Sequence, residues 1–530
     1  MEGLPPVSAG SGGSVEIPWF TRGDLDGFFA LFIDNLIQLM LVAALCPTVC
    51  GIPADYVIRV ILPGAAVSVV FGNLAYAWQA RQLMRATGRT DVTALPYGVA
   101  ITSLIANIYL IMGPVYAATH DWHLAYHVGL FACFLRSALE TVAAFFGGWI
   151  RRHTPRAALL SPLGGIALAY VALSFILEIF AHPGISLVPL FILLVGYTPG
   201  VRLPGRIPAG LLAVGIGTAL GWIFKAMGWF SFSQPELGPL HLALPHPMPF
   251  LSFVFSSTGL KYLSVILPVT LVHLIEGLQI LESAEVAGDA YDTRLSLITN
   301  GVGGMIAAAF GSCFPTSLYV GHPAWKKLGA RSGYSVLNAV AITLVCFSGG
   351  IALILKFVPL QPSMAIMMWV GMAMTAQAFT DVPKSHAIAS VLGMLPLLAQ
   401  WGFGLVKSTA AASGSSLGAL IDRFGDDLAI RGLIGLGQGA LLSSMLLSAM
   451  LVLIIERKFA RAAVWALIAA GASSVGLIHA FGVTPTGISN VYGWCVAPEF
   501  AVSYLFVAAL LGAMHLTRRT TTLADAETQP

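Results

Sequence analysis

The chain has 530 residues, of which 57% are hydrophobic and only 10% are charged, and its mean hydropathy is +0.84. A soluble domain carries about 25% charged residues, so this composition excludes an ordinary soluble protein and indicates an integral membrane protein. The net charge of +3 comes from short, scattered basic clusters and does not predict a nucleic-acid partner.

Apolar runs of about 20 residues, long enough to cross a bilayer, recur along the whole chain. They predict an all-α polytopic membrane protein with sixteen spans. The spans are expected near 26–46, 57–80, 92–112, 124–148, 158–180, 184–199, 208–228, 258–281, 295–311, 314–328, 334–356, 362–380, 383–403, 433–455, 462–482 and 499–516.

The distribution of basic residues supports this topology. If both termini are cytoplasmic, 19 of the 27 Lys and Arg residues lie inside, seven lie outside, and Arg136 lies within a span. Cytoplasmic loops of membrane proteins carry an excess of Lys and Arg. A single missing span would invert every later loop and remove the bias, so we expect a multi-pass cell-membrane protein (the inner membrane, in a bacterium) with cytoplasmic termini.

Two of the spans are interrupted by proline. They read "TDVTALPYGVAITSLIANIYL" (90–110) and "GSCFPTSLYVGHPAWKKLG" (311–329), and each combines a Pro, a nearby Tyr, small hydroxyl residues and a following Gly. Proline removes a helical hydrogen bond, and the freed main-chain groups cannot face lipid. The segments are third and tenth in the span order, which predicts an inverted repeat whose broken helices meet near the midplane.

The chain resembles the xanthine/uracil/vitamin C permease family, the nucleobase–ascorbate transporters, and is most similar to their hypoxanthine/guanine permease-like branch. Over roughly residues 26–455, the resemblance is carried by "LVHLIEGLQ", "ITNGVGGMIAAAFGSCFPTSLYVGH", "ARSGYSVLNAVAIT" and "QPSMAIMMWVGMAMTAQAFTDVPKSHAIASVLGMLPL". It implies two inverted seven-span repeats, with core spans 1–4 and 8–11 and gate spans 5–7 and 12–14. It also implies core movement past the gate like an elevator, and a homodimer through the gate.

The domains expected on this basis follow the two repeats. Residues 1–25 form a cytoplasmic tail, 26–228 the first repeat, 229–257 an outer loop and 258–455 the second repeat. Residues 456–530 add two spans and a tail that lie outside the family pattern.

The stretch "LPVTLVHLIEGLQILESAEVAGD" (267–289) places His273, Glu276 and Gln279 within two helical turns of span 8. By the resemblance, Glu276 is the substrate-binding acid, which accepts ring N–H groups. A carboxylate inside a membrane is costly and functional by default, so Glu276 is also a candidate for proton coupling. His273 could partner it or be a packing donor. Glu282 and Glu285 are expected to be a solvated helix end.

Span 10 departs from the family pattern. Thr316, Ser317 and Tyr319 match polar positions, but Gly321 and His322 stand where the family has an acid or amide. Either one substrate hydrogen bond is missing or His322 supplies it in another form, which puts nucleobase specificity in doubt. In span 3, the substrate is expected to lie beside Pro96 and Tyr97.

Span 1 contains "FIDNLIQLML", in which Asn35 takes the place of a family histidine and Asp34 is an additional acid. Asp34 is a second candidate for ion or proton coupling, or a partner in helix–helix hydrogen bonding. Arg136 and Glu140 in span 4 lie four residues apart, which favours a structural ion pair. Asn73, Asn300 and Asn338 are expected to be packing amides.

These observations predict a secondary active transporter of a nucleobase or similar planar heterocycle, with protons favoured over sodium as the coupling ion. One alternative keeps the fold but carries a small anion such as bicarbonate or sulfate; the missing acid of span 10 favours it and Glu276 opposes it. A remote alternative is a membrane-embedded enzyme. The six cysteines form no C-x-x-C pair and no cofactor or metal site is expected.

Overall fold

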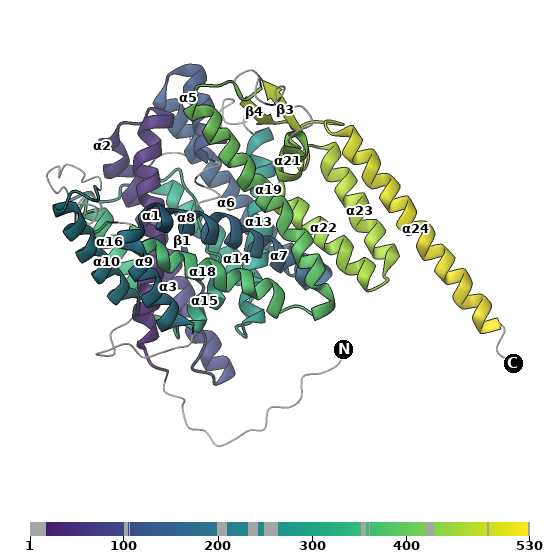
Figure 1. The fold of residues 1–530 in the computed structure, drawn as a ribbon, viewed down its shortest axis with the longest axis horizontal. Helices are drawn as coiled ribbons and strands as arrows, with labels where there is room; N and C mark the ends of the chain where they lie inside the picture. The colour runs from purple at the N-terminus through teal and green to yellow at the C-terminus, as the bar shows by residue number, and fades with distance from the viewer. Residues whose placement is uncertain are drawn as a thin grey trace.

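The computed structural model is a helical bundle with two short pairs of strands (Figure 1). It describes residues 17–99, 104, 107–198, 209–231, 242–248, 263–350, 357–359, 361–418, 421, 429–484 and 487–527. The segment expected as the outer loop, 229–257, lies largely outside these residues.

The described part of the first half contains one strand and helices of very different length. Its elements are α1 (Gly23–Cys50), α2 (Ala54–Tyr56), the π-helical η1 (Val57–Ile61), α3 (Leu62–Thr87), β1 (Tyr97–Val99), η2 (Asn107–Met112), α5 (Gly113–Thr119), α6 (Trp122–His153), α7 (Arg156–Ile166), η3 (Ala167–Leu173), α8 (Ser174–Ala181), α9 (Pro183–Tyr197) and α10 (Ala209–Ala226).

The second half repeats this order, and two further helices follow it. Its elements are α13 (Leu263–Val286), α14 (Thr293–Ala309), β2 (Thr316–Leu318), α15 (His322–Lys327), α16 (Gly333–Phe347), α18 (Gln361–Thr380), η5 (Lys384–His386), α19 (Ala387–Ala412), α21 (Ile430–Gly437) and α22 (Ala440–Ile455). After them come α23 (Phe459–Ser474), the hairpin β3 (Phe481–Thr484) and β4 (Gly487–Asn490), and α24 (Pro498–Glu527).

Among the described residues, seven helices are long and apolar enough to cross a membrane, and the bent pair α21–α22 would make an eighth. Four further apolar helices have 10–17 residues. Sixteen long helices are not seen partly because the segments expected at 92–112 and 314–328 are each a strand followed by helix. Proline at the start of each strand explains this, since it removes a main-chain donor and disfavours helix before it.

The packing of the helices repeats between the halves, as an inverted repeat requires. By order in the chain, α1 corresponds to α13, α3 to α14 and α6 to α16. The contact between α3 and α16 is matched by the one between α14 and α6, and the contact between α1 and α16 by the one between α13 and α6. In the same way α9 packs on α10 as α19 packs on α22, and α7 packs on α19 as α18 packs on α9. In each of these contacts, exchanging both helices for their counterparts in the other half gives another observed contact. The fold is therefore a 7+7 inverted repeat.

The same contacts separate the helices into a core group and a gate group. The core group contains α1, α3, α6, α13, α14, α16 and both strands of the β1–β2 pair, and the gate group contains α7 to α10, α18, α19 and α22. The groups touch where α13 meets α7 and α22, where α1 meets α10 and α18, and where α15 meets α18. The added helix α23 packs on α22, and α24 packs on α23 at the rim of the molecule (Figure 1).

The two interrupted segments meet in the core group. Strands β1 and β2 pair antiparallel, with Tyr97 opposite Leu318, Gly98 opposite Ser317 and Val99 opposite Thr316. All six residues are buried. A main-chain group left unpaired in a bilayer costs several kcal/mol, so each strand supplies partners that the broken helix of the other half lacks. We call this pair of strands the crossing.

Glycines on a helix from each half make room for the crossing. A Cβ on Gly72 of α3 would lie 2.0 Å from the ring of Tyr97, and a Cβ on Gly303 of α14 would lie 1.9 Å from its hydroxyl oxygen. The tyrosine therefore fits between the two helices only because both positions lack a side chain.

Gly72→Ala is expected to lower the melting temperature of the purified protein, because forcing a methyl group into a packed core costs about 1–3 kcal/mol. Thermal unfolding in detergent measures this. Gly148→Ala is the matched control, since a Cβ there meets nothing within 4 Å. Equal melting temperatures for Gly72→Ala and the parent would contradict the packing described here.

Candidate functional site

The main chain of the crossing is fixed by one asparagine from each half. Asn73 on α3 donates from Nδ2 to the carbonyl oxygen of Tyr97 at 3.1 Å. Asn300 on α14 accepts at Oδ1 from the N–H of Leu318 at 3.0 Å. Both side chains are buried. The prediction of plain packing amides misses this role, and the one sequence signal for it is a lone Asn within a small-residue helix that precedes an interrupted span.

Four of the expected site residues are brought together around the crossing. The hydroxyl groups of Tyr97 and Thr316 lie 2.7 Å apart, and Tyr319 donates to the carbonyl oxygen of Val99 at 2.8 Å. Asn35 on α1 reaches the carbonyl oxygen of Tyr97 at 3.4 Å. Their polar groups bond to one another and to the strands, so in this structure they hold the crossing together.

Pro96 and Ser317 also belong to the crossing. Pro96 directly precedes β1, and Ser317 lies within β2. The carbonyl oxygen of Pro96 accepts from the N–H of Tyr319 at 2.8 Å, which extends the pairing by one bond. The Ser317 hydroxyl lies 3.4 Å from Nδ2 of Asn300. This contact leads from the crossing to the buried charges of the core.

Three charged residues lie behind β2. Glu140 on α6 accepts from Nδ2 of Asn300 and interacts electrostatically with both Arg136 and Glu276. All three side chains are buried, with exposed fractions of 4% for Arg136, 2% for Glu140 and 6% for Glu276. Arg136, Glu140 and Glu276, here called the charged trio, carry one positive and two negative formal charges.

The other candidates for ion coupling lie on α1 and α13. Asp34 accepts from Nε2 of Gln38 at 3.2 Å, one turn further along α1. His273 belongs to α13, but its side chain lies outside the described part of the structure.

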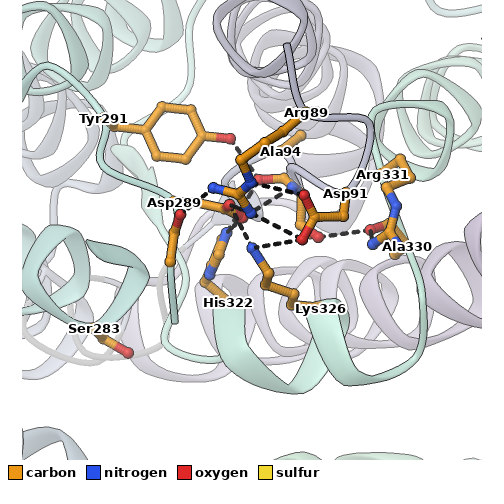
Figure 2. Close-up of polar contacts among 12 residues, drawn as sticks. Arg89, Asp91, Ala94, Ser283, Asp289, Tyr291, His322, Lys326, Ala330 and Arg331 are labelled. Carbon is orange, nitrogen blue, oxygen red and sulfur yellow. Dashed lines mark hydrogen bonds and ion pairs between the residues drawn. The ribbon is translucent and has the colours of Figure 1, made fainter. Parts of the chain in front are cut away.

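His322 lies in a polar cluster at the basic end of the bundle, the end that also holds Arg89 and Lys326. Its Nε2 is 3.0 Å from the carbonyl oxygen of Thr93 and 3.2 Å from Oδ2 of Asp289. Figure 2 shows the ring pointing at that carboxylate. Gly321 caps the start of α15 with φ +144°, and a Cβ on it would meet the ring of Trp325. The structure thus places His322 beside Asp289.

Asp289 is the centre of this cluster. It is fully buried and accepts from Lys326, from Nη2 of Arg89 at 3.1 Å and from the N–H of Thr93 at 3.0 Å. Burial by itself would raise the pKa of Asp289, but the contacts with His322, Lys326 and Thr93 outweigh it and lower the pKa to about 2. One carboxylate between α13 and α14 therefore holds both broken spans (Figure 2).

Further polar contacts at the same end join the core to the gate. Asp26 on α1 accepts from the hydroxyl of Tyr197 and the N–H of Gly210, each at 3.0 Å. Glu282 on α13 accepts from Nε of Arg156 at 2.8 Å. Ser283 bonds to Gln377 of α18 through both its hydroxyl and its carbonyl oxygen.

The prediction that Glu282 and Glu285 form a solvated helix end is wrong for Glu282. Its side chain is 8% exposed and paired with two arginines, Arg151 on α6 and Arg156 on α7. These arginines flank the connection from core to gate, and Arg151 also pairs with Glu285. The partners come from more than 120 positions away in the sequence, so hydropathy along the chain could not identify them.

Comparison with known proteins found likeness only at the level of structure. No family model and no curated protein sequence matches the chain. Among solved structures, the transmembrane domain of the cyanobacterial bicarbonate transporter BicA aligns at 16% identity and a TM-score of 0.42, covering 72% of this chain and 95% of that one. SLC26A9 aligns at 13% identity and a TM-score of 0.44, covering 71% of this chain and 62% of that one.

These findings correct the resemblance to the nucleobase–ascorbate transporters. The matched structures include BicA and SLC26A9, and no family model matches. The motifs that suggested that family mark the interrupted spans and the helices around them. Nucleobase, purine and xanthine specificity is therefore set aside.

The pKa of Asp289 gives a prediction for stability. An unstructured Asp has a pKa of about 3.9, so the contacts of Asp289 contribute about 2–3 kcal/mol. Because the pKa is lowered on folding, this contribution is complete above about pH 4 and is lost as the pH falls towards 2. Asp289→Asn is expected to lower the melting temperature at pH 7, with the deficit shrinking at pH 3.

Melting curves of the two proteins at both pH values measure this. Asp55→Asn is the control, because its partner Arg59 and Asp55 itself are half-exposed or more and such pairs contribute little. A deficit for Asp289→Asn that is the same at pH 7 and pH 3 would contradict the lowered pKa.

Proposed function

We propose that the protein is a secondary transporter that carries a small anion such as bicarbonate or sulfate across the membrane. The observation that carries the proposal is the crossing, where broken spans from the two halves meet in the middle of the core. Main chain released from helices in this way supplies polar groups for a substrate near the midplane, and half-helix starts favour negative charge.

The direction of the chain at the crossing supports an anion. Strand β1 leads into helix, with Leu104 the first helical residue described after it, and β2 leads into α15 at His322. The second segment therefore has the start of a short helix, the positive end of its dipole, just after its strand. Val320 and Gly321 follow Tyr319, so this turn carries no acid that would repel an anion.

The charged trio suggests how a proton is coupled to the anion. One guanidinium and two carboxylates leave a formal charge of −1 beside β2, which opposes anion binding. Protonation of Glu276 would bring the trio to zero. In this proposal a proton and an anion enter together, which removes the objection that a buried carboxylate repels the substrate. Asp34 is the second candidate for this proton.

The contacts between core and gate suggest the route of movement. In an elevator mechanism the core slides past the gate, so every bond between them must break or change partner. Asp26, Glu282 and Ser283 all bond to the gate at the basic end, which faces the cytoplasm by the positive-inside rule. This structure then corresponds to the state closed on the cytoplasmic side. A homodimer through the gate stays a prediction.

A thermal-shift screen of the purified protein tests the proposal. The panel contains bicarbonate, sulfate, chloride, purines, pyrimidines and urate, at pH 5.5 and 7.5. A ligand that binds the folded state raises the melting temperature by mass action. Stabilisation by an oxyanion is expected, and for sulfate, which stays ionised at both pH values, it should be stronger at pH 5.5. Stabilisation by a purine or pyrimidine alone would refute the anion proposal.

Glu276→Gln is expected to keep anion uptake but lose its dependence on pH, because the amide resembles the protonated carboxyl group. Uptake into proteoliposomes between pH 5.5 and 8 measures this, with the parent expected to be faster at low pH. A variant whose pH profile matches that of the parent would remove Glu276 from proton coupling, and Asp34→Asn is then the variant to compare.

Glu282→Gln is expected to open the cytoplasmic side more often, because the variant weakens the bond to Arg156. The measurement is the labelling rate of a single cysteine introduced on the gate-facing side of α13, in a background where the exposed Cys495 is replaced by Ser. A cytoplasmic thiol reagent should react several-fold faster. Glu285→Gln is the control, since Glu285 pairs with Arg151 of the core. Equal rates in both variants and the parent would contradict the proposal that the Glu282–Arg156 bond holds the cytoplasmic side closed.

A further inference from the structure

Gln279 lies on the side of α13 that faces the gate. Ile275 packs in one apolar cluster with Ala158 and Leu159 of α7 and with four residues of α22. Ser283 bonds to Gln377 of α18. Residues four apart lie on one face of a helix, so Gln279 stands between two positions that both contact the gate.

The carboxamide of Gln279 is buried without a partner. Its side chain is fully buried, and neither Nε2 nor Oε1 makes a hydrogen bond within the described part of the chain. A buried polar group almost always has a partner, and an exception calls for a ligand, a water or a functional reason. Gln279 lies on the surface along which the core would slide past the gate, one helical turn from Glu276.

The first half of the chain shows what an amide at this place can do. "NLIQL" (35–39) in α1 and "EGLQI" (276–280) in α13 put a glutamine three residues after a polar residue in the first helix of each half. In the first half, Nε2 of Gln38 donates to the carboxylate of Asp34 at 3.2 Å. The second half has Ile275 where the first has Asp34, so the acid that bonds to Gln38 has no counterpart four residues before Gln279.

We propose that Gln279 is a substrate-contacting residue whose amide N–H groups donate to an oxyanion as it passes between the core and the gate. The inference rests on the anion transport proposed above. A neutral amide suits this position because it offers donors without adding a charge beside Glu276. The oxyanion would accept from Gln279 as the Asp34 carboxylate accepts from Gln38 in the first half.

The test uses the full-length protein and the variant Gln279→Leu, with sulfate and bicarbonate as probes. Removing an unpaired buried amide should raise the melting temperature without anion. Losing a hydrogen bond to a charged group should raise the apparent Kd for the anion about tenfold, measured from the concentration dependence of the thermal shift. Gln279→Glu should abolish anion-induced stabilisation at pH 7.5.

Asn338→Leu is the matched control. Asn338 is also fully buried with both amide atoms unpartnered among the described residues, but it lies on α16, which packs on α1 and α3 within the core. This variant should leave the anion Kd unchanged. An unchanged Kd in Gln279→Leu, with the parent stabilised by anion, would overturn the role of Gln279 alone. A parent that neither anion stabilises would overturn anion transport, and with it the role of Gln279.

Discussion

The need to satisfy every main-chain polar group inside a bilayer governs this structure. Two spans are broken by proline, and the groups that they release pair across the crossing of β1 and β2. The asparagines at 73 and 300 complete this pairing from the two halves, and the glycines at 72 and 303 make room for Tyr97. In the extended segment that precedes β1, the main chain of Thr93 bonds to the side chains of Asp289 and Tyr291.

The buried carboxylates Asp289 and Glu276 have different surroundings. Asp289 has Arg89, Lys326 and His322 around it, so it remains ionised and holds the broken spans in place. Glu276 lies near Glu140 and Arg136 in the charged trio. We propose proton coupling for Glu276 and a structural role for Asp289.

The sequence predicts the parts of this arrangement that local rules determine. Proline within an apolar span predicts the interruption, the repeated order of spans predicts the inverted repeat, and hydropathy predicts that Glu276 is buried. It does not predict that His322 turns towards Asp289, because the turn at Gly321 redirects the chain. Nor does it predict the partners of Asp289 and Glu282, which come from distant segments. The motifs that suggested nucleobase permeases follow the broken spans, and a fold does not determine what is carried.

The most direct test of the account is uptake by the purified protein in proteoliposomes under an inward proton gradient. Labelled sulfate and bicarbonate are supplied separately, and unlabelled purines and pyrimidines are added as competitors. We expect gradient-dependent uptake of sulfate, or uptake of bicarbonate above that of protein-free liposomes, which CO2 crosses unaided, and no effect of the nucleobases on either. Uptake of a labelled nucleobase, with neither anion transported, would contradict it.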